Sequence, residues 1–220
     1  MSLRECRLIV ERLFVAAGAH PGLVPGARDV AVAAEVLGLG LLRAVHDDAD
    51  LIRPTASPRA EVRETSAGVQ LIADDVLSIY LAPALRDLLL ELPAGATVSV
   101  TGVRRPEWLE AIALTPGLES IELTPGDGGA IVRLGTEAAA SAPRAERVRA
   151  AIDHAQRVGL AADPELWFAL YVRSNDALAE DTAQSRAHAG YRDVDEAGRI
   201  VKQMDDDTDL EHALRNRVAS

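Results

Sequence analysis

Apolar positions recur at helical spacing in the first part of the chain. From Ile9 to Ala17 they repeat every three or four residues, and Ser2 with Glu5 forms the capping-box pattern that marks a helix start. A second run at this spacing extends from about residue 27 to residue 46. The short turn-rich link between the runs predicts an antiparallel pair of helices.

The pattern changes to strand-like alternation after the Pro-rich stretch that ends at residue 58. Two alternating segments flank a Ser-Ala-Gly turn, and two more flank a Pro-Gly-Asp-Gly-Gly turn, so each pair predicts a β-hairpin. Leucines at helical spacing predict a helix from Asp74 or Asp75 to Leu92, and Pro106 opens another helix. The expected strands cover residues 60–65, 68–73, 96–103, 118–124 and 129–134.

Helical patterning returns at Pro143. One helix is expected to end at Gly159, and Asp163 is expected to cap the next. The tail, residues 196–220, is expected to form a helix, an acidic break and a short last helix. These patterns predict an α+β (or α/β) fold with an N-terminal helix pair, a mixed sheet flanked by helices and a helical C-terminal region. We expect residues 1–140 to form the α/β core and residues 141–220 to pack on the same domain.

Composition narrows the class of partner. A net charge of -11 argues against nucleic acid as the main binding partner, because binding its phosphates needs a basic protein surface. No apolar run approaches the roughly 20 residues of a membrane span. A single cysteine, Cys6, excludes an internal disulfide and fits a reducing compartment. We therefore expect an acidic, cytoplasmic protein with no nucleic-acid or membrane partner. Its Ala- and Leu-rich helices suggest a homo-oligomer.

Residues 179–198 are the most unusual stretch, because they combine polar and charged side chains with hardly an apolar residue. Two arginines there can clamp a carboxylate or phosphate, and a His and a Tyr can orient a substrate or donate a proton. A polar loop ordered by Arg–Asp pairs is the alternative. The candidate ligand-binding residues are Ser185, Arg186, His188, Tyr191, Arg192 and Asp193.

Two acidic clusters could suggest a metal ion. Adjacent residues on a helix diverge by about 100°, so the cluster from His46 to Asp50 is expected to be a solvated helix end. The cluster from Asp205 to Glu211 lacks the spacing of a calcium loop. No metal site is predicted.

The segment from residue 4 to residue 92 resembles the N-terminal part of the malate/L-lactate dehydrogenase-like oxidoreductases. The resemblance is carried by the helix-pair sequence ending in "LLRAV" and by the strand-turn-strand segment "IRPTASPRAEVRETSAGVQLIADD". It implies an NAD(P)-dependent reaction on a 2-hydroxy acid, with Arg43 and His46 near the substrate.

A second resemblance involves both ends of the chain. The opening "SLRECRLIVERLFVAAGAHPGL" and the later "LWFALYVRSNDALAEDTAQSRAHAGYRDVDE" are similar to a bacterial family of uncharacterised proteins. That family has no assigned activity, so the resemblance implies no mechanism. The matching residues are Trp167, Ser185, Arg186, Ala189, Gly190, Asp193 and Asp195.

No complete catalytic signature is present in the sequence. The leading hypothesis is therefore a non-catalytic binding or accessory protein without a cofactor, acting on an unidentified small molecule or protein partner. One alternative is the NAD(P)-dependent oxidoreductase. Another is a hydrolase or lyase that uses residues 185–195.

Overall fold

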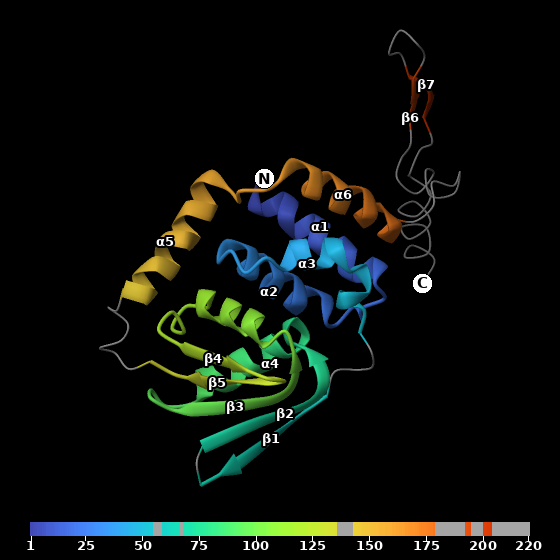
Figure 1. The fold of residues 1–220 in the computed structure, drawn as a ribbon. Helices are drawn as coiled ribbons and strands as arrows, with labels where there is room; N and C mark the ends of the chain where they lie inside the picture. Colours follow the sequence, from blue (N-terminus) through green and yellow to red (C-terminus); the bar gives the residue numbers. More distant parts are fainter. Residues whose placement is uncertain (55–58, 67, 136–142, 179–191, 195–199, 204–220) are drawn as a thin grey trace, which may run out of the picture. The chain divides into compact units, whose positions relative to one another are not determined.

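The computed structural model describes residues 1–54, 59–66, 68–135, 143–178, 192–194 and 200–203. The chain forms two compact units, residues 1–177 and residues 178–220. The first unit combines helices with a five-stranded mixed sheet, which confirms the predicted α+β fold (Figure 1). Among the described residues, no helix is both long and apolar enough to cross a membrane.

The N-terminal helix pair is present, and its first member begins as predicted. Helices α1 (Leu3–Ala16) and α2 (Val24–Val36) pack together. The Ser2 hydroxyl oxygen accepts the Glu5 amide hydrogen, and the Glu5 carboxylate accepts the Ser2 amide hydrogen, which completes the capping box.

The second predicted helix is in fact two helices. Instead of running to His46, α2 ends at Val36, and α3 (Leu41–Asp47) follows after a break. Gly38 and Gly40 have φ of 71° and 68° in this break, a left-handed conformation that glycine adopts without steric cost. The short 3-10 helix η1 (Ala49–Ile52) follows α3.

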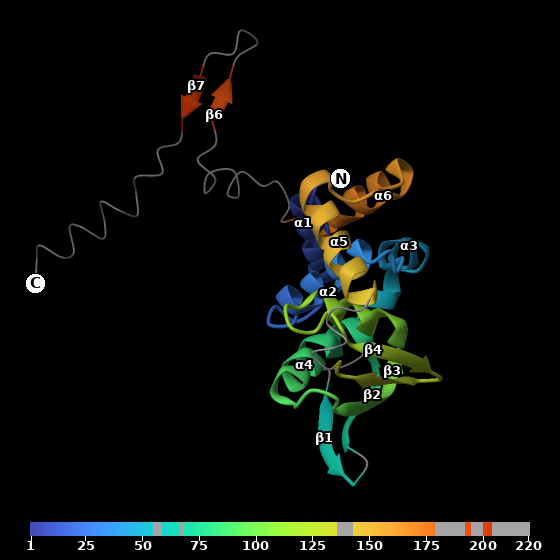
Figure 2. The same ribbon diagram turned by 90° about the vertical axis from the view of Figure 1, so that its left-hand side faces the viewer.

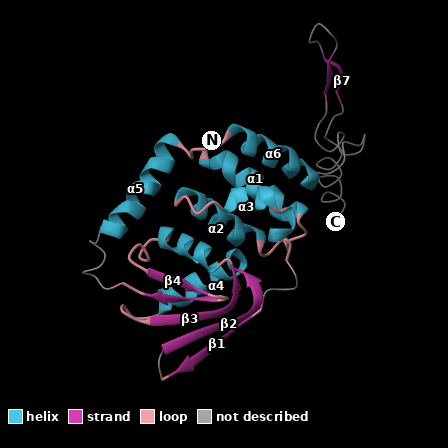
Figure 3. Ribbon diagram, viewed as in Figure 1, coloured by secondary structure: helices cyan, strands magenta, loops and turns pink. Residues whose placement is uncertain are grey.

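The sheet has the order β1-β2-β3-β5-β4. Figure 3 shows its strands in magenta beside the helices in cyan. Both predicted hairpins are present as antiparallel pairs, β1 with β2 and β4 with β5, and β3 lies parallel to β2 and antiparallel to β5. The strands are β1 (Ala60–Thr65), β2 (Gly68–Leu77), β3 (Thr97–Arg104), β4 (Glu122–Gly126) and β5 (Gly129–Arg133).

Two helical connections within the sheet differ from the sequence prediction. Helix α4 (Ser78–Glu91) begins after Leu77 rather than at Asp74 or Asp75, because β2 continues through both aspartates past a register shift. The segment opened by Pro106 is the 3-10 helix η2 (Pro106–Leu114). Both elements contact the sheet and α2, so they form the layer between the sheet and the N-terminal helices.

Two further helices complete the first unit. Helix α5 (Pro143–Val158) contacts η2 and α2, and α6 (Pro164–Ser174) contacts α1 and α3. The short 3-10 helix η4 (Asn175–Ala177) follows α6. All three elements lie within the first unit, residues 1–177.

The second unit contains β6 (Arg192–Val194) and β7 (Ile200–Gln203), which pair antiparallel. The expectation of a helix in this part of the tail is wrong at residues 200–203, where the backbone is extended and bonded to β6. The predicted acidic break and last helix lie outside the described residues.

Candidate functional site

The polar stretch singled out in the sequence lies mostly outside the described residues. This is so for Ser185, Arg186, His188 and Tyr191. The other two candidate residues lie in β6, where Arg192 pairs with Gln203 and Asp193 with Lys202. Ligand binding by this stretch remains a prediction.

Arg43 connects two helices. Its Nη2 atom lies 2.6 Å from Oδ2 of Asp163, the residue that caps α6 by accepting the amide hydrogens of Glu165 and Leu166. The hydrogen bond from Arg43, and then those two amides, lower the pKa of Asp163. Arg43 thus has a structural role between α3 and α6. A role near a substrate remains a prediction.

His46 contacts its own neighbour, with Nδ1 3.1 Å from Oδ1 of Asp47. The acids that follow it have local partners, since Asp48 caps η1 by accepting the Asp50 amide hydrogen, and Asp50 pairs with Arg53. Within the described ranges, no three His, Cys, Asp or Glu side chains are grouped so that they could hold a metal ion. The cluster from Asp205 to Glu211 lies outside those ranges.

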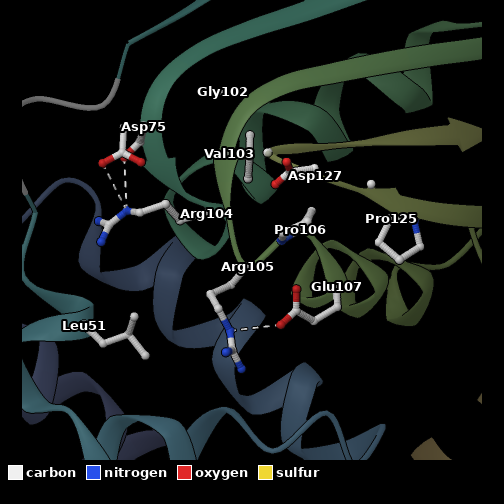
Figure 4. A pocket seen from close by; sticks show the side chains of 12 residues that line it. Leu51, Asp75, Gly102, Val103, Arg104, Arg105, Pro106, Glu107, Pro125 and Asp127 are labelled. Atoms are coloured by element: carbon white, nitrogen blue, oxygen red, sulfur yellow. Dashed lines mark hydrogen bonds and ion pairs between the residues drawn. The ribbon is translucent and has the colours of Figure 1, made fainter.

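A cavity of about 740 Å³ opens at the carboxyl ends of the parallel strands β2 and β3 (Figure 4). Ligands in α/β proteins commonly bind at this edge of a parallel sheet, and the volume is suited to a small molecule. The turn between β4 and β5 and the start of η2 complete its wall. The lining residues are Leu51, Asp75, Gly102, Val103, Arg104, Arg105, Pro106, Glu107, Pro125, Gly126, Asp127 and Gly128.

Hydrogen bonds to backbone carbonyl oxygens hold this edge of the sheet in place. The buried Ser78 hydroxyl, at the start of α4, donates to the carbonyl oxygen of Arg105 at 2.7 Å. The Val103 amide donates to the carbonyl oxygen of Gly128 at 3.0 Å, which joins the β4–β5 turn to the end of β3. The cavity wall is therefore built by three segments that are distant in the sequence.

Asp75 and Arg105 line the cavity in an uncommon backbone conformation. They are the two non-glycine residues with positive φ in the described part of the chain, at 51° and 57°. This conformation costs an ordinary residue about 1–3 kcal/mol, and such residues are concentrated at functional sites. Their presence at one cavity marks it as the candidate site.

Each of the two arginines is anchored through its Nε atom. Nε of Arg104 donates to the Asp75 carbonyl oxygen at 3.2 Å and lies 3.5 Å from its carboxylate. Nε of Arg105 lies 2.9 Å from Oε1 of Glu107, and its guanidinium carbon lies 4.6 Å from the ring centre of the buried Trp108. In each ion pair Nε is the nitrogen closest to the carboxylate, and the acidic partners among the described residues are Asp75 for Arg104 and Glu107 for Arg105.

The charges around the cavity are mixed. The lining contains two arginines and three acids, Asp75, Glu107 and Asp127, so its formal charge is 2 - 3 = -1. The arginines offer paired N–H donors to an oxyanion, whereas the acids offer acceptors to hydroxyl or amine groups. Among the described residues that line it, there is no Ser, Thr, Cys, Lys or His side chain to act as a nucleophile.

The sequence alone did not indicate this site. The strand end "TGVRRPEW" (residues 101–108) has two adjacent arginines immediately before a proline that starts a helical segment. That pattern was a usable signal, but nothing in it showed that Asp75 and Asp127 would lie alongside.

The chain matches no known family model, and no curated protein is significantly similar to it.

Proposed function

We propose that this protein is a non-catalytic binding protein whose cavity holds a small metabolite with a carboxylate or phosphate group. The observation that supports this is that Arg104 and Arg105, adjacent in the sequence, both line the cavity, and that each is held beside an acid with Nε as its closest nitrogen. An end-on guanidinium presents two parallel N–H donors, which fit two oxygens of one oxyanion.

The local packing suits the arginines to this role. Ion pairs with Asp75 and Glu107, together with the indole ring of Trp108, restrict the side chains before a ligand arrives. Preorganisation lowers the conformational entropy lost on binding. The acids also disfavour a highly charged polyanion, so we expect a ligand with one or two oxyanion groups and further hydrogen-bond donors.

Titration calorimetry of the full chain tests the proposal, with inorganic phosphate, succinate and AMP as probes. We expect Arg104→Gln and Arg105→Gln each to weaken binding of the preferred probe about tenfold or more, since a hydrogen bond to a charged group contributes about 1.5–3 kcal/mol. Comparing the affinities for inorganic phosphate and for succinate shows whether the cavity recognises a phosphate or a carboxylate group.

Arg157→Gln is the matched control. Arg157 also donates from Nε to a carbonyl oxygen, that of Asp153, and pairs with the same residue's carboxylate, but it lies outside this cavity. Absence of binding for all three probes, or equal loss in the control, would contradict the proposal. If only the double variant Arg186→Ala, His188→Ala loses binding, the polar stretch at 179–198 is the site instead.

A further inference from the structure

Strand β1 forms one edge of the five-stranded sheet and is exposed on both faces (Figures 1 and 2). All six of its residues, Ala60–Thr65, are exposed to solvent. Among the described strands it pairs with β2 alone, so along residues 60–64 its outer edge carries backbone donors and acceptors that no other described strand bonds. An open strand edge is a template for pairing with another chain.

The opposite edge of the sheet is protected in a way that β1 is not. Strand β4 is five residues long and contains Pro125, which has no amide hydrogen to donate. Strand β1 contains neither Pro nor Gly, and it includes the β-branched residues Val62 and Thr65. Its edge is thus compatible with a continuous ladder of hydrogen bonds.

An apolar row crosses the sheet and ends at β1. Val62 pairs with Leu71, Leu71 with Val100, and Val100 with Ala130. The last three side chains are at most 5% exposed, whereas Val62 is 54% exposed. Directly opposed residues in neighbouring strands lie on the same face of a sheet. A further strand that places an apolar side chain opposite Val62 would therefore extend the row.

The charges of β1 select the same register. Glu61 and Arg63 flank Val62 on the other face of the strand, where Nη2 of Arg63 lies 2.9 Å from Oε1 of Glu61. In an antiparallel pair of two β1 strands centred on Val62, each Glu61 lies opposite Arg63 of the partner subunit. If the pair were instead centred between Val62 and Arg63, each Glu61 would lie opposite Glu64 of the partner subunit. Like charges that are directly opposed destabilise a sheet.

We propose that two copies of this chain associate through β1, antiparallel and centred on Val62, to form one continuous sheet. Main-chain hydrogen bonds supply the affinity, and the Val62 contact with the two Glu61–Arg63 pairs sets the register. Such a twofold interface uses the same surface on both copies. The inference is independent of the proposed ligand site.

A cysteine crosslink tests the register directly. In this arrangement the two Val62 Cα atoms lie about 4.5–5.5 Å apart, within disulfide range. We expect the Val62→Cys chain to form a covalent dimer under mild oxidation. The matched control is Glu64→Cys, which lies on the same face of β1. In the dimer the two cysteines at position 64 would be about 13 Å apart, so this variant should not crosslink. The native Cys6 is fully buried, so it does not compete.

Charge reversal provides a second test that needs no oxidation. Sedimentation velocity at about 0.15 M salt, where repulsion between two chains of charge -11 is screened, should show a concentration-dependent dimer. Arg63→Glu should weaken the dimer about tenfold or more, and the double variant Glu61→Arg, Arg63→Glu should restore it. A monomer at all concentrations, or a dimer insensitive to Arg63→Glu, would overturn the proposal, the latter indicating another interface.

Discussion

At the scale of single residues, the candidate site depends on backbone conformations that few residue types adopt. Gly102 has φ of 69° and lies opposite the register shift in β2, where a Cβ atom would overlap the carbonyl oxygen of Ala73. The β2 chain bends there and brings Asp75 to the cavity. Glycine at this position is required both by conformation and by space.

Gly102→Ala is expected to lower the free energy of unfolding by roughly 2–5 kcal/mol, combining about 1–2 for the left-handed backbone with about 1–3 for the overlap. Gly38→Ala is the matched control, because Gly38 has nearly the same φ but open space around it, and it should lose only about 1–2 kcal/mol. Urea denaturation of both variants measures the difference. Equal losses would show that the close approach to Ala73 has no energetic weight.

At the scale of elements, one side chain connects the two helices on either side of the break at Leu37–Gly40. The Glu35 carboxylate, on α2, accepts the Leu42 amide hydrogen at the start of α3 at 2.8 Å. Burial raises the pKa of Glu35, and hydrogen bonds from the amides of Leu42 and Leu41 partly oppose this. Burial, with a smaller contribution from Glu35, also raises the pKa of the Cys6 thiol to about 12.

Glu35→Gln should make the protein more stable at pH 7. The folded-state pKa of Glu35 lies above its unfolded value, so the folded state binds the proton more tightly, and stability is lost as pH rises through the folded-state pKa. Glutamine keeps the acceptor for Leu42 and removes the charge. Thermal unfolding at pH 7 and at pH values below the unfolded pKa of about 4.3 measures this.

The gain in stability of Glu35→Gln should disappear in acid, where Glu35 is protonated in both the folded and the unfolded protein. Glu35→Ala serves as the control, since it removes the acceptor and should lower the melting temperature at both pH values. A destabilised Glu35→Gln at pH 7 would mean that the charge of Glu35 strengthens the cap more than burial penalises it.

At the scale of the whole molecule, the chain divides after Ala177. The first unit has a continuous apolar core that extends from Cys6 on α1 to Leu170 on α6 and includes buried side chains of the sheet. The main-chain bond from the Leu160 amide to the carbonyl oxygen of Met1 joins the segment after α5 to the N-terminus. Helices α5 and α6 thus belong to this unit.

A chain of residues 1–177 is therefore expected to fold by itself and to unfold in one cooperative transition with the midpoint of the full chain. Differential scanning calorimetry of both chains measures this. A chain of residues 1–140, which ends at the boundary expected from the sequence, is the comparison and should be less stable because it lacks α5 and α6. A markedly lower midpoint for residues 1–177 would show that residues 178–220 stabilise the first unit.

Local chemistry made much of the element order predictable. The Ser2–Glu5 capping box, the Asp163 cap, the stop at Gly159 and both hairpins depend on residues close in sequence, and all are present. Where local signals competed, prediction failed. Asp74 and Asp75 have the character of helix caps, yet pairing of β2 with β3 keeps them in the strand.

The sequence by itself determined the α+β class and most elements, because periodicity, caps and turns act within a few residues. Only the tertiary structure decided the candidate site and the open edge. The cavity joins Asp75, Arg104 and Asp127 from separate strands and a turn, and strand order leaves β1 without an outer neighbour. Both features arise from long-range backbone pairing, which local patterns do not specify because any alternating strand can pair with many others.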